Sequence, residues 1–297
     1  MELLADLSRS LEALVETGGA SVVRVEARRS LAASGVIWAS DGLIVAADHA
    51  VERDEGVRVG LPDGAAVPAV VVGRDPSTDV ALLRAEATGL ASPRWGDAAS
   101  ARAGRLVLGL GRPGRTIRAT LAVVSAAADR WETPGGGVLD RYVEIDGRPH
   151  PGFSGSLLVD ASGGALGMTT SGLLRRAMLA VPASTLGRVA EALLAHGRIR
   201  RGYLGVGAQP VRLPPAARQA YGQDAGLLVL SVEPGSPADQ AGVMLGDVVL
   251  GLGSDRVHDV HDLLRALQAE RIGTRMPLRI LRAGAARELA VVIGERG

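Results

Sequence analysis

Residues 150–160 read HPGFSGSLLVD, and they are the most informative part of the chain. Ser154 stands in it between two glycines and directly before an apolar, strand-like run. Glycine on each side opens backbone conformations that other residues avoid and lets another carbonyl group approach closely. We expect the loop Gly152–Phe153–Ser154 to form an oxyanion hole, in which the N–H groups of Gly152 and Ser154 converge. Because Gly-Ser-Gly also marks ordinary turns, the assignment of Ser154 as a nucleophile needs partners elsewhere in the chain.

Two upstream segments supply those partners. LIVAADHAV (43–51) carries His49, and DPSTDVALLR (75–84) carries Asp79. Either residue alone also suits a structural role, His49 in a core and Asp79 at a strand end. A carboxylate at the mouth of an apolar strand is costly unless it is hydrogen-bonded, and an imidazole N–H would supply that bond. The pairing would leave the other ring nitrogen free to take a proton from Ser154. The order His, Asp, Ser is that of chymotrypsin-type double barrels.

Two rival motifs fail on the same sequence. An α/β-hydrolase elbow needs G-x-S-x-G, but Ser156 stands where its second glycine belongs, and no strand–helix alternation surrounds the motif. GLGRPG (109–114) matches G-x-G-x-x-G, but strand-like residues follow it instead of the helix that a dinucleotide site requires. We therefore expect no cofactor.

Composition narrows the class further. The 297 residues suffice for two or three domains, and aromatic residues make up only 2%, so the cores must consist of small aliphatic side chains. The net charge of +1 gives no electrostatic footprint for nucleic acid. The chain has no cysteine, which excludes disulfides and thiolate metal sites. His258 and His261 lie three apart without a further ligand aimed at them, so no metal site is expected.

The N-terminal segment, residues 1–19, predicts an amphipathic helix. Leucines recur in it at helical spacing, and Gly18-Gly19 marks its end. Glu2 and Asp6 stand where a signal peptide would carry positive charge, and no run in the chain is long enough to span a membrane. As written, the sequence indicates a cytoplasmic protein, and a periplasmic or secreted one only if a leader has been removed.

Short strand-like runs separated by turns follow this helix. They form one set before and one set after a crossover at residues 86–100. The runs are 20–27, 34–46, 56–61, 65–72 and 79–84 in the first set, and 105–110, 116–126, 138–145, 155–160, 165–170 and 177–181 in the second. The pattern predicts a mainly β domain over residues 20–183, built as two six-stranded barrels with His49 and Asp79 on the first and Ser154 on the second.

These motifs resemble the HtrA (Deg) family of trypsin-like serine proteases. SVVRV, SGVIWASDGLIVAADHAV, GRDPSTDVALLR, GLGRPG and HPGFSGSLLVD occur in the family's order and at about its spacing, and the match extends over residues 20–297. The resemblance implies that His49 is the base, Asp79 its orienting group and Ser154 the nucleophile.

The chain departs from the family at several positions near the site. The family usually has Asn in place of Phe153, Gly-Pro in place of Ser156-Leu157, and Thr-Asn in place of Ala47-Asp48. Phe153 leaves the backbone donors in place, but its bulk could alter the loop. Arg148 stands where trypsin-like folds often form the base of the specificity pocket. Residues 168–172 (MTTSG) would form the pocket wall, which suggests a small apolar preference.

The last third of the chain predicts a separate α+β module. Residues 184–200 are helix-like and connect to it, and residues 201–297 resemble a PDZ domain. In that family a peptide C-terminus adds as a strand beside a helix, and backbone N–H groups bind its carboxylate. The resemblance places the peptide site at Tyr203, Leu204, Gly205 and Val206, with Leu263 or Leu264 and Leu267 on a helix over residues 259–270.

Three functions compete at this point. The resemblance implies an ATP-independent serine endopeptidase that cleaves unfolded or exposed polypeptides, with a PDZ domain that recruits or regulates through peptide C-termini. The alternative is a catalytically impaired chaperone or adaptor that binds peptides through the PDZ domain. A hydrolase of small esters fits the double barrel and the peptide module less well. The family usually trimerises through its N-terminal region, so a homo-trimer is the expected assembly.

Overall fold

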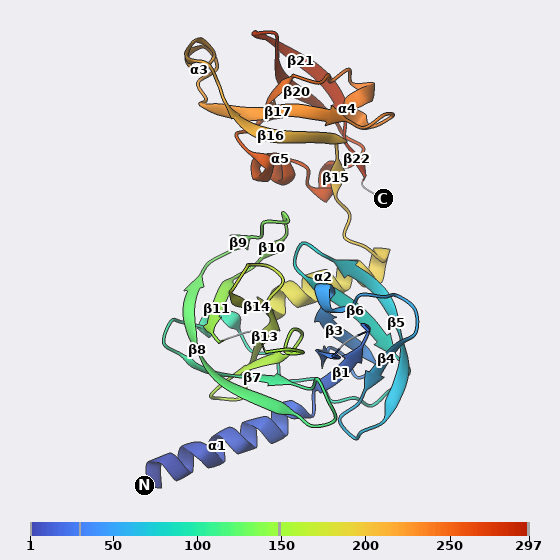
Figure 1. Ribbon diagram of the computed structural model, residues 1–297, viewed down its shortest axis with the longest axis vertical. Helices are drawn as coiled ribbons and strands as arrows, with labels where there is room; N and C mark the ends of the chain where they lie inside the picture. The colour runs from blue at the N-terminus through green and yellow to red at the C-terminus, as the bar shows by residue number, and fades with distance from the viewer. Residues whose placement is uncertain (1, 30, 148–149, 296–297) are drawn as a thin grey trace. The chain divides into compact units, whose positions relative to one another are not determined.

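The computed structural model describes residues 2–29, 31–147 and 150–295. The chain divides into two compact units, Met1–Ile199 and Arg200–Gly297 (Figure 1). Two barrels and two helices make up the first unit, and a twisted sheet with short helices makes up the second.

Two closed, six-stranded barrels form the body of the first unit. Their strand orders are β1-β2-β3-β6-β5-β4 and β11-β14-β13-β12-β7-β8. The strands of the first barrel are β1 (Val22–Glu26), β2 (Ala33–Ile37), β3 (Leu43–Ala47), β4 (Val57–Gly60), β5 (Ala66–Asp75) and β6 (Val80–Ala85). Those of the second are β7 (Leu106–Gly111), β8 (Arg118–Ala128), β11 (Tyr142–Asp146), β12 (Leu157–Asp160), β13 (Ala165–Thr170) and β14 (Met178–Pro182). The predicted mainly β double barrel is confirmed.

Side chains that alternate along each strand divide the apolar residues between separate cores. On β3, Ile44 and Ala46 point into the first barrel, while Leu43, Val45 and Ala47 join a second cluster that also contains residues of the other barrel. Both faces of β3 are therefore buried, which explains its continuous apolar sequence. The shared cluster joins the two barrels on the side where β3 leads into His49.

Turns divide the predicted runs more finely than the sequence alone indicates. The run 34–46 becomes the antiparallel pair β2–β3, with a turn at Gly42. Gly42 has a φ of +92°, and a Cβ there would lie 2.4 Å from the carbonyl oxygen of Ala85, so only glycine fits. A short hairpin, β9 (Trp131–Glu132) with β10 (Val138–Leu139), follows β8.

Two helices flank the barrels. α1 (Glu2–Gly19) rests its last turn on β7, because a Cβ at Gly18 would meet the side chain of Leu110 at 2.5 Å. Buried Arg112 donates from its guanidinium to the carbonyl oxygens of Gly19, Val22 and Arg115, and so satisfies acceptors at the helix end. α2 (Ala183–His196) packs on the inter-barrel cluster and ends at a left-handed glycine at position 197.

The second unit is an α+β fold around a sheet of order β16-β17-β18-β20-β21. Its strands are β16 (Val206–Arg212), β17 (Ala225–Val232), β18 (Val248–Leu252), β19 (Asp255–Arg256), β20 (Arg275–Arg282) and β21 (Ala285–Val292), with β15 (Gly202–Tyr203) paired to β22 (Gly294–Glu295). The helices are α3 (Pro215–Tyr221), α4 (Pro237–Gln240) and α5 (Val260–Ala266). The helix predicted over 259–270 is shorter in the structure, because α5 ends at Ala266 and a separate 3-10 turn (Ala269–Arg271) follows.

Candidate active site

The register of two paired strands brings His49 and Asp79 together. β3 ends at Ala47 and β6 begins at Val80, and these two residues lie opposite each other in the antiparallel pair. The chain therefore leaves β3 beside the place where it enters β6. His49 follows β3 in a short 3-10 helix (Asp48–Ala50), and Asp79 directly precedes β6.

Asp79 is a buried carboxylate that three donors hold in place. Its Oδ1 accepts the backbone N–H of His49 at 2.9 Å, and its Oδ2 lies 2.8 Å from His49 Nδ1. The hydroxyl of Thr170, on β13 of the second barrel, donates to the same Oδ2. Because a carboxylate only accepts, the ring proton sits on Nδ1 and Nε2 is left as a proton acceptor. The Asp79 side chain is 5% exposed and that of His49 is 37% exposed, so the imidazole ring is open to solvent while its partner is buried.

The turn before β6 fixes Asp79 in a backbone conformation that non-glycine residues rarely adopt. Its φ is +56°, a conformation that costs roughly 1–2 kcal/mol. Asp75 stabilises the turn by accepting the N–H and hydroxyl of Ser77 and the hydroxyl of Thr78. The N–H of Asp48 donates to the carbonyl of Asp79 at 3.1 Å. Strain of this kind persists where surrounding bonds hold it, and it is frequent at functional sites.

Ser154 lies on a loop of the second barrel that packs against the first barrel. A Cβ at Gly155, whose φ is +87°, would lie 2.0 Å from the carbonyl oxygen of Ser34 and 3.5 Å from the N atom of Ala47. The N–H of Ser34 donates to the carbonyl of Ser154 at 3.2 Å. These contacts set the loop beside the end of β3, next to His49.

The hydroxyl of Ser154 has a neighbour that the sequence does not reveal. Its Oγ lies 3.2 Å from the Oγ of Ser171, which follows β13. Within the described parts of the chain, no hydrogen bond joins Ser154 to His49. Catalytic hydrogen bonds are often long in free enzymes and tighten when a substrate binds.

Two backbone donors beside Ser154 are available for an oxyanion. In the ranges 2–29, 31–147 and 150–295, neither the N–H of Gly152 nor that of Ser154 donates a hydrogen bond to the protein. Gly152 has a φ of +82°. The N–H of Phe153 donates to the carbonyl of His150 at 3.0 Å, which leaves Gly152 and Ser154 as the two donors that the sequence predicts in this loop. The Phe153 ring is 5% exposed and packs edge-on against His150, which directs its bulk inward.

Ser34 of the first barrel is hydrogen-bonded to the loop that carries these two donors. Its hydroxyl donates to the carbonyl of Gly152 at 2.8 Å and accepts the N–H of Arg112 at 2.8 Å. With the backbone bond from Ser34 to Ser154, one buried residue anchors the carbonyl groups on both sides of Phe153.

The predicted pocket wall reaches the surface only at its end. In residues 168–172, Met168 is fully buried in the inter-barrel cluster and Thr170 bonds Asp79, whereas Ser171 is half-buried and Gly172 is exposed. A Cβ at Gly172 would lie 2.6 Å from both His49 Nδ1 and Asp79 Oδ2. Arg148, the predicted base of the specificity pocket, lies outside the described residues.

Asp48, one of the departures from the family pattern, is paired. Arg74 on β5 bonds its carboxylate at 3.1 Å and that of Asp54 at 2.6 Å. Burial raises the pKa of the Asp48 carboxyl, and the Arg74 guanidinium opposes that shift by stabilising the charged form. The negative charge of Asp48, next to His49 in the chain, is therefore balanced by the Arg74 guanidinium.

The expected carboxylate-binding loop of the second unit has free backbone donors. The carbonyls of Leu204 and Gly205 accept the N–H groups of Ala238 and Glu233, both at 2.9 Å, whereas among the described residues the N–H groups of Leu204 and Gly205 have no acceptor. Gly205 has a φ of +81°, and a Cβ there would lie 2.2 Å from the Cβ of Ser236. The hydroxyl of Tyr203 donates to the Glu233 carboxylate.

Helix α5 presents a different set of side chains from the one predicted. Val260 and Leu264, one helical turn apart, are 39% and 36% exposed. Leu263 and Leu267 are buried in the core with Leu204. Leu267 lies at the end of the helix, where its carbonyl accepts a backbone hydrogen bond, so of the predicted leucines Leu264 faces solvent.

Comparison with known proteins agrees with this architecture. Residues 33–168 match the family model of the trypsin-like peptidase domain, and residues 202–293 match that of the PDZ domain. The chain is 32% identical over 270 residues to a Brucella suis protein named probable periplasmic serine endoprotease DegP-like, and 30% identical over 278 residues to a Chlamydia trachomatis protein of the same name. These alignments cover 88% and 91% of the chain but 52% and 55% of the relatives. The chain thus spans about half the length of the curated relatives it matches.

Solved structures resemble the chain over nearly its whole length. The serine endoprotease from Yersinia pestis matches with a TM-score of 0.75 and 26% identity, covering 96% of this chain and 98% of that one. The HtrA-type protease AlgW with a tripeptide matches with a TM-score of 0.73 and 27% identity, covering 96% and 97%. The fold is that of a trypsin-like serine peptidase domain followed by a PDZ domain. The chain belongs to the HtrA (Deg) family.

Sequence reasoning missed the residues that hold the site together. The sequence gives Ser34 no role, and it places Thr170, Ser171 and Gly172 only in the pocket wall, without a contact to Asp79 or Ser154. Ser34 and Thr170 are hydroxyl residues in otherwise apolar strands, and a buried hydroxyl needs a partner, which is the one signal that could have found them.

We expect Gly172→Ala to reduce activity strongly, because its methyl group would occupy space 2.6 Å from both members of the His49–Asp79 pair. A displacement on the order of 1 Å in a catalytic group can cost roughly 100-fold in rate. The measurement is kcat/KM on an unfolded protein substrate. Gly114→Ala is the matched control, since a Cβ there meets nothing within 4 Å. Equal activity of the two variants would contradict the placement.

Proposed function

We propose that this chain is a serine endopeptidase that cleaves unfolded or exposed polypeptides without a nucleotide. The observation that carries the proposal is the pairing of His49 with buried Asp79 beside a serine whose neighbouring backbone N–H groups are unpaired among the described residues. The curated relatives are named serine endoproteases, which supports the same reaction class.

The geometry suggests the following steps. Ser154 Oγ attacks the scissile carbonyl carbon while His49 Nε2 takes the hydroxyl proton, and Asp79 stabilises the resulting imidazolium. The oxyanion accepts hydrogen bonds from the N–H groups of Gly152 and Ser154. His49 then returns the proton to the leaving amine as the peptide C–N bond breaks and an acyl-enzyme forms. Water, deprotonated by His49, hydrolyses the ester and frees Ser154.

The adaptor alternative loses support from the same loop. It rested on the possibility that Phe153 and Ser156 spoil the oxyanion hole. The Phe153 side chain is buried on the inner side of the loop, and the Ser156 hydroxyl is hydrogen-bonded to Thr169. The fold therefore accommodates both side chains.

Ser154→Ala should abolish degradation of unfolded casein, because it removes the attacking oxygen. We expect kcat to fall by about 10⁴-fold or more. The measurement is release of acid-soluble peptides, and Ser162→Ala, in the turn after β12, is the control variant. Equal degradation by wild type and Ser154→Ala would refute the nucleophile. An inactive wild type that still binds peptides would favour the adaptor.

For the second unit we propose binding of short peptide C-termini along the edge strand β16. Gly205 and Leu213, which flank β16, both bond across to residues flanking β17. The register shift between β16 and β17 leaves one residue of β17 unpaired and none of β16. Every second residue of β16 therefore directs its backbone groups to the same side along the whole strand. Val206, Ala208 and Pro210 therefore turn their backbone groups to the free edge. Proline lacks an N–H group, so full pairing with an added strand ends after Ala208.

We expect a peptide with an apolar C-terminal residue and a free carboxylate to bind the full chain at least about 10-fold more tightly than the same peptide with a C-terminal amide. The charged terminus would take the free N–H groups of Leu204 and Gly205. Fluorescence anisotropy with a dye-labelled peptide measures the difference. Tetrapeptide and decapeptide versions should bind within about threefold of each other, because Pro210 limits the pairing. Equal binding of acid and amide would overturn the assignment.

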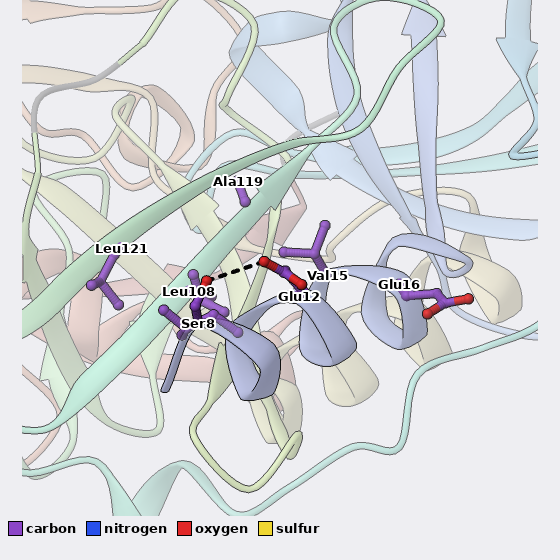
Figure 2. A pocket seen from close by; sticks show the side chains of 8 residues that line it. Ser8, Glu12, Val15, Glu16, Leu108, Ala119 and Leu121 are labelled. Atoms are coloured by element: carbon purple, nitrogen blue, oxygen red, sulfur yellow. Dashed lines mark hydrogen bonds between the residues drawn. The ribbon is translucent and has the colours of Figure 1, made fainter. Parts of the chain in front are cut away.

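We propose that copies of the chain associate through α1, with a trimer as the expected assembly. Leu3, Leu4 and Leu7 are 80%, 70% and 42% exposed, and the helix extends from the barrels at this end (Figure 1). An apolar pocket opens between α1 and the strands β7 and β8 (Figure 2). Its lining residues are Ser8, Leu11, Glu12, Val15, Glu16, Leu108, Ala119 and Leu121. A leucine row continuous with an apolar pocket suits the helix of a second copy.

Light scattering should give about three times the chain mass of 30.5 kDa for the wild type and a lower mass for Leu3→Ser/Leu4→Ser, which removes the most exposed apolar surface. Leu230→Ser, at a 49% exposed leucine on β17, is the matched control. A wild type of monomer mass would contradict the proposal.

The relatives are named periplasmic proteins, and we propose the periplasm as the compartment in place of the cytoplasm. No helix among the described residues is long and apolar enough to cross a membrane.

A further inference from the structure

Two buried hydroxyl groups lie directly behind the nucleophile loop. Ser156 precedes β12 and is fully buried, and Thr169 on β13 is 2% exposed. Their side-chain oxygens are 2.5 Å apart. Ser156 is one of the positions at which the chain departs from the pattern of the family it resembles. Neither hydroxyl takes part in the proposed catalytic steps.

Both residues hold the carbonyl group of Phe153. The N–H of Ser156 donates to this oxygen at 2.9 Å, and the Thr169 hydroxyl donates to it at 3.0 Å. A hydroxyl has one hydrogen, and that of Thr169 is used for the carbonyl. The Ser156 hydroxyl must therefore donate to Thr169, so the bonds run in one direction, from Ser156 through Thr169 to Phe153.

The carbonyl of Phe153 and the N–H of Ser154 belong to the same planar peptide group. In a trans peptide the two point in opposite directions, so fixing the oxygen also fixes the direction of the N–H. Aligned hydrogen bonds polarise one another, which makes the N–H a stronger donor. The second donor of the hole, on Gly152, belongs to a different peptide group and is not held by this pair.

The rest of the loop is braced independently of these side-chain hydroxyls. The backbone of Thr169 accepts the N–H of Gly155 at 2.8 Å and donates to the carbonyl of Ser156 at 2.8 Å, and Ser34 holds the carbonyls of Gly152 and Ser154. Removing a hydroxyl therefore leaves the loop attached to both barrels and changes only the restraint on one peptide group.

We propose that Ser156 and Thr169 are positioning residues that aim the Ser154 N–H at the oxyanion, an inference that rests on the proposed peptidase function. Their hydroxyls act through the Phe153 peptide and never touch the substrate.

Thr169→Val removes the hydroxyl with little change in volume. Removing an oxyanion donor outright costs roughly 100- to 1000-fold in kcat, so loss of its aim should cost less, about 10-fold, with KM unchanged. Ser156→Ala should cost about threefold, and the double variant no more than Thr169→Val, because Ser156 acts through Thr169. Inhibition by a peptide boronic acid, whose adduct places an oxygen in the hole, should weaken in parallel with kcat.

Thr185→Val is the matched control, because Thr185 is also a fully buried threonine with hydroxyl bonds, but on α2 and bonded to Asp140. Thr169→Ser keeps the hydroxyl and should retain wild-type kcat. If Thr169→Val fails to fold, Ser156→Ala and Thr169→Ser still decide the question. Wild-type kcat and boronate affinity in Ser156→Ala and in any folded Thr169→Val would overturn the inference, as would equal losses in Thr185→Val. An inactive wild type, or activity that survives Ser154→Ala, would instead refute the proposed function.

Discussion

The contact between Gly155 and Ser34 is the constraint on which the rest of the site depends. The loop that carries Ser154 belongs to one barrel and the His49–Asp79 pair to the other, so the candidate site exists only if the two barrels meet in one register. A Cβ at Gly155 would lie 2.0 Å from the Ser34 carbonyl oxygen, which means that any larger residue would separate them. The apolar cluster that the two barrels share holds them together, and the close contact at Gly155 sets their relative position.

Two side-chain hydrogen bonds between the barrels add to this alignment. Thr170 of the second barrel donates to Asp79 of the first, while Ser34 of the first donates to Gly152 of the second. Each barrel thus restrains a functional group carried by the other. Such reciprocal restraint suits a site that must be held to within a fraction of an ångström.

The sequence predicted the elements of this site better than their interactions. The order and spacing of His49, Asp79 and Ser154 indicated the double barrel, because His49 follows a recognisable apolar run and Asp79 and Ser154 each precede one. The role of Thr170 could not be predicted, because its partner is 91 residues away and only the barrel closure brings the two together. The same holds for Ser34, whose partner is 118 residues away.

Where side-chain patterns failed, local backbone bonding was the reason. Leu267 fits the apolar spacing of a longer helix, but α5 ends one residue earlier and the side chain turns into the core. Apolar spacing indicates which residues can share a face, whereas turn hydrogen bonds decide where the face ends.

We propose above all that His49 activates Ser154 as the nucleophile. The most direct measurement is reaction with a fluorophosphonate probe, followed by mass spectrometry of the modified peptide. We expect a single adduct on Ser154 that is lost in His49→Ala and retained in His150→Ala. An adduct on Ser171, whose hydroxyl lies 3.2 Å away, or labelling that survives in His49→Ala, would contradict it.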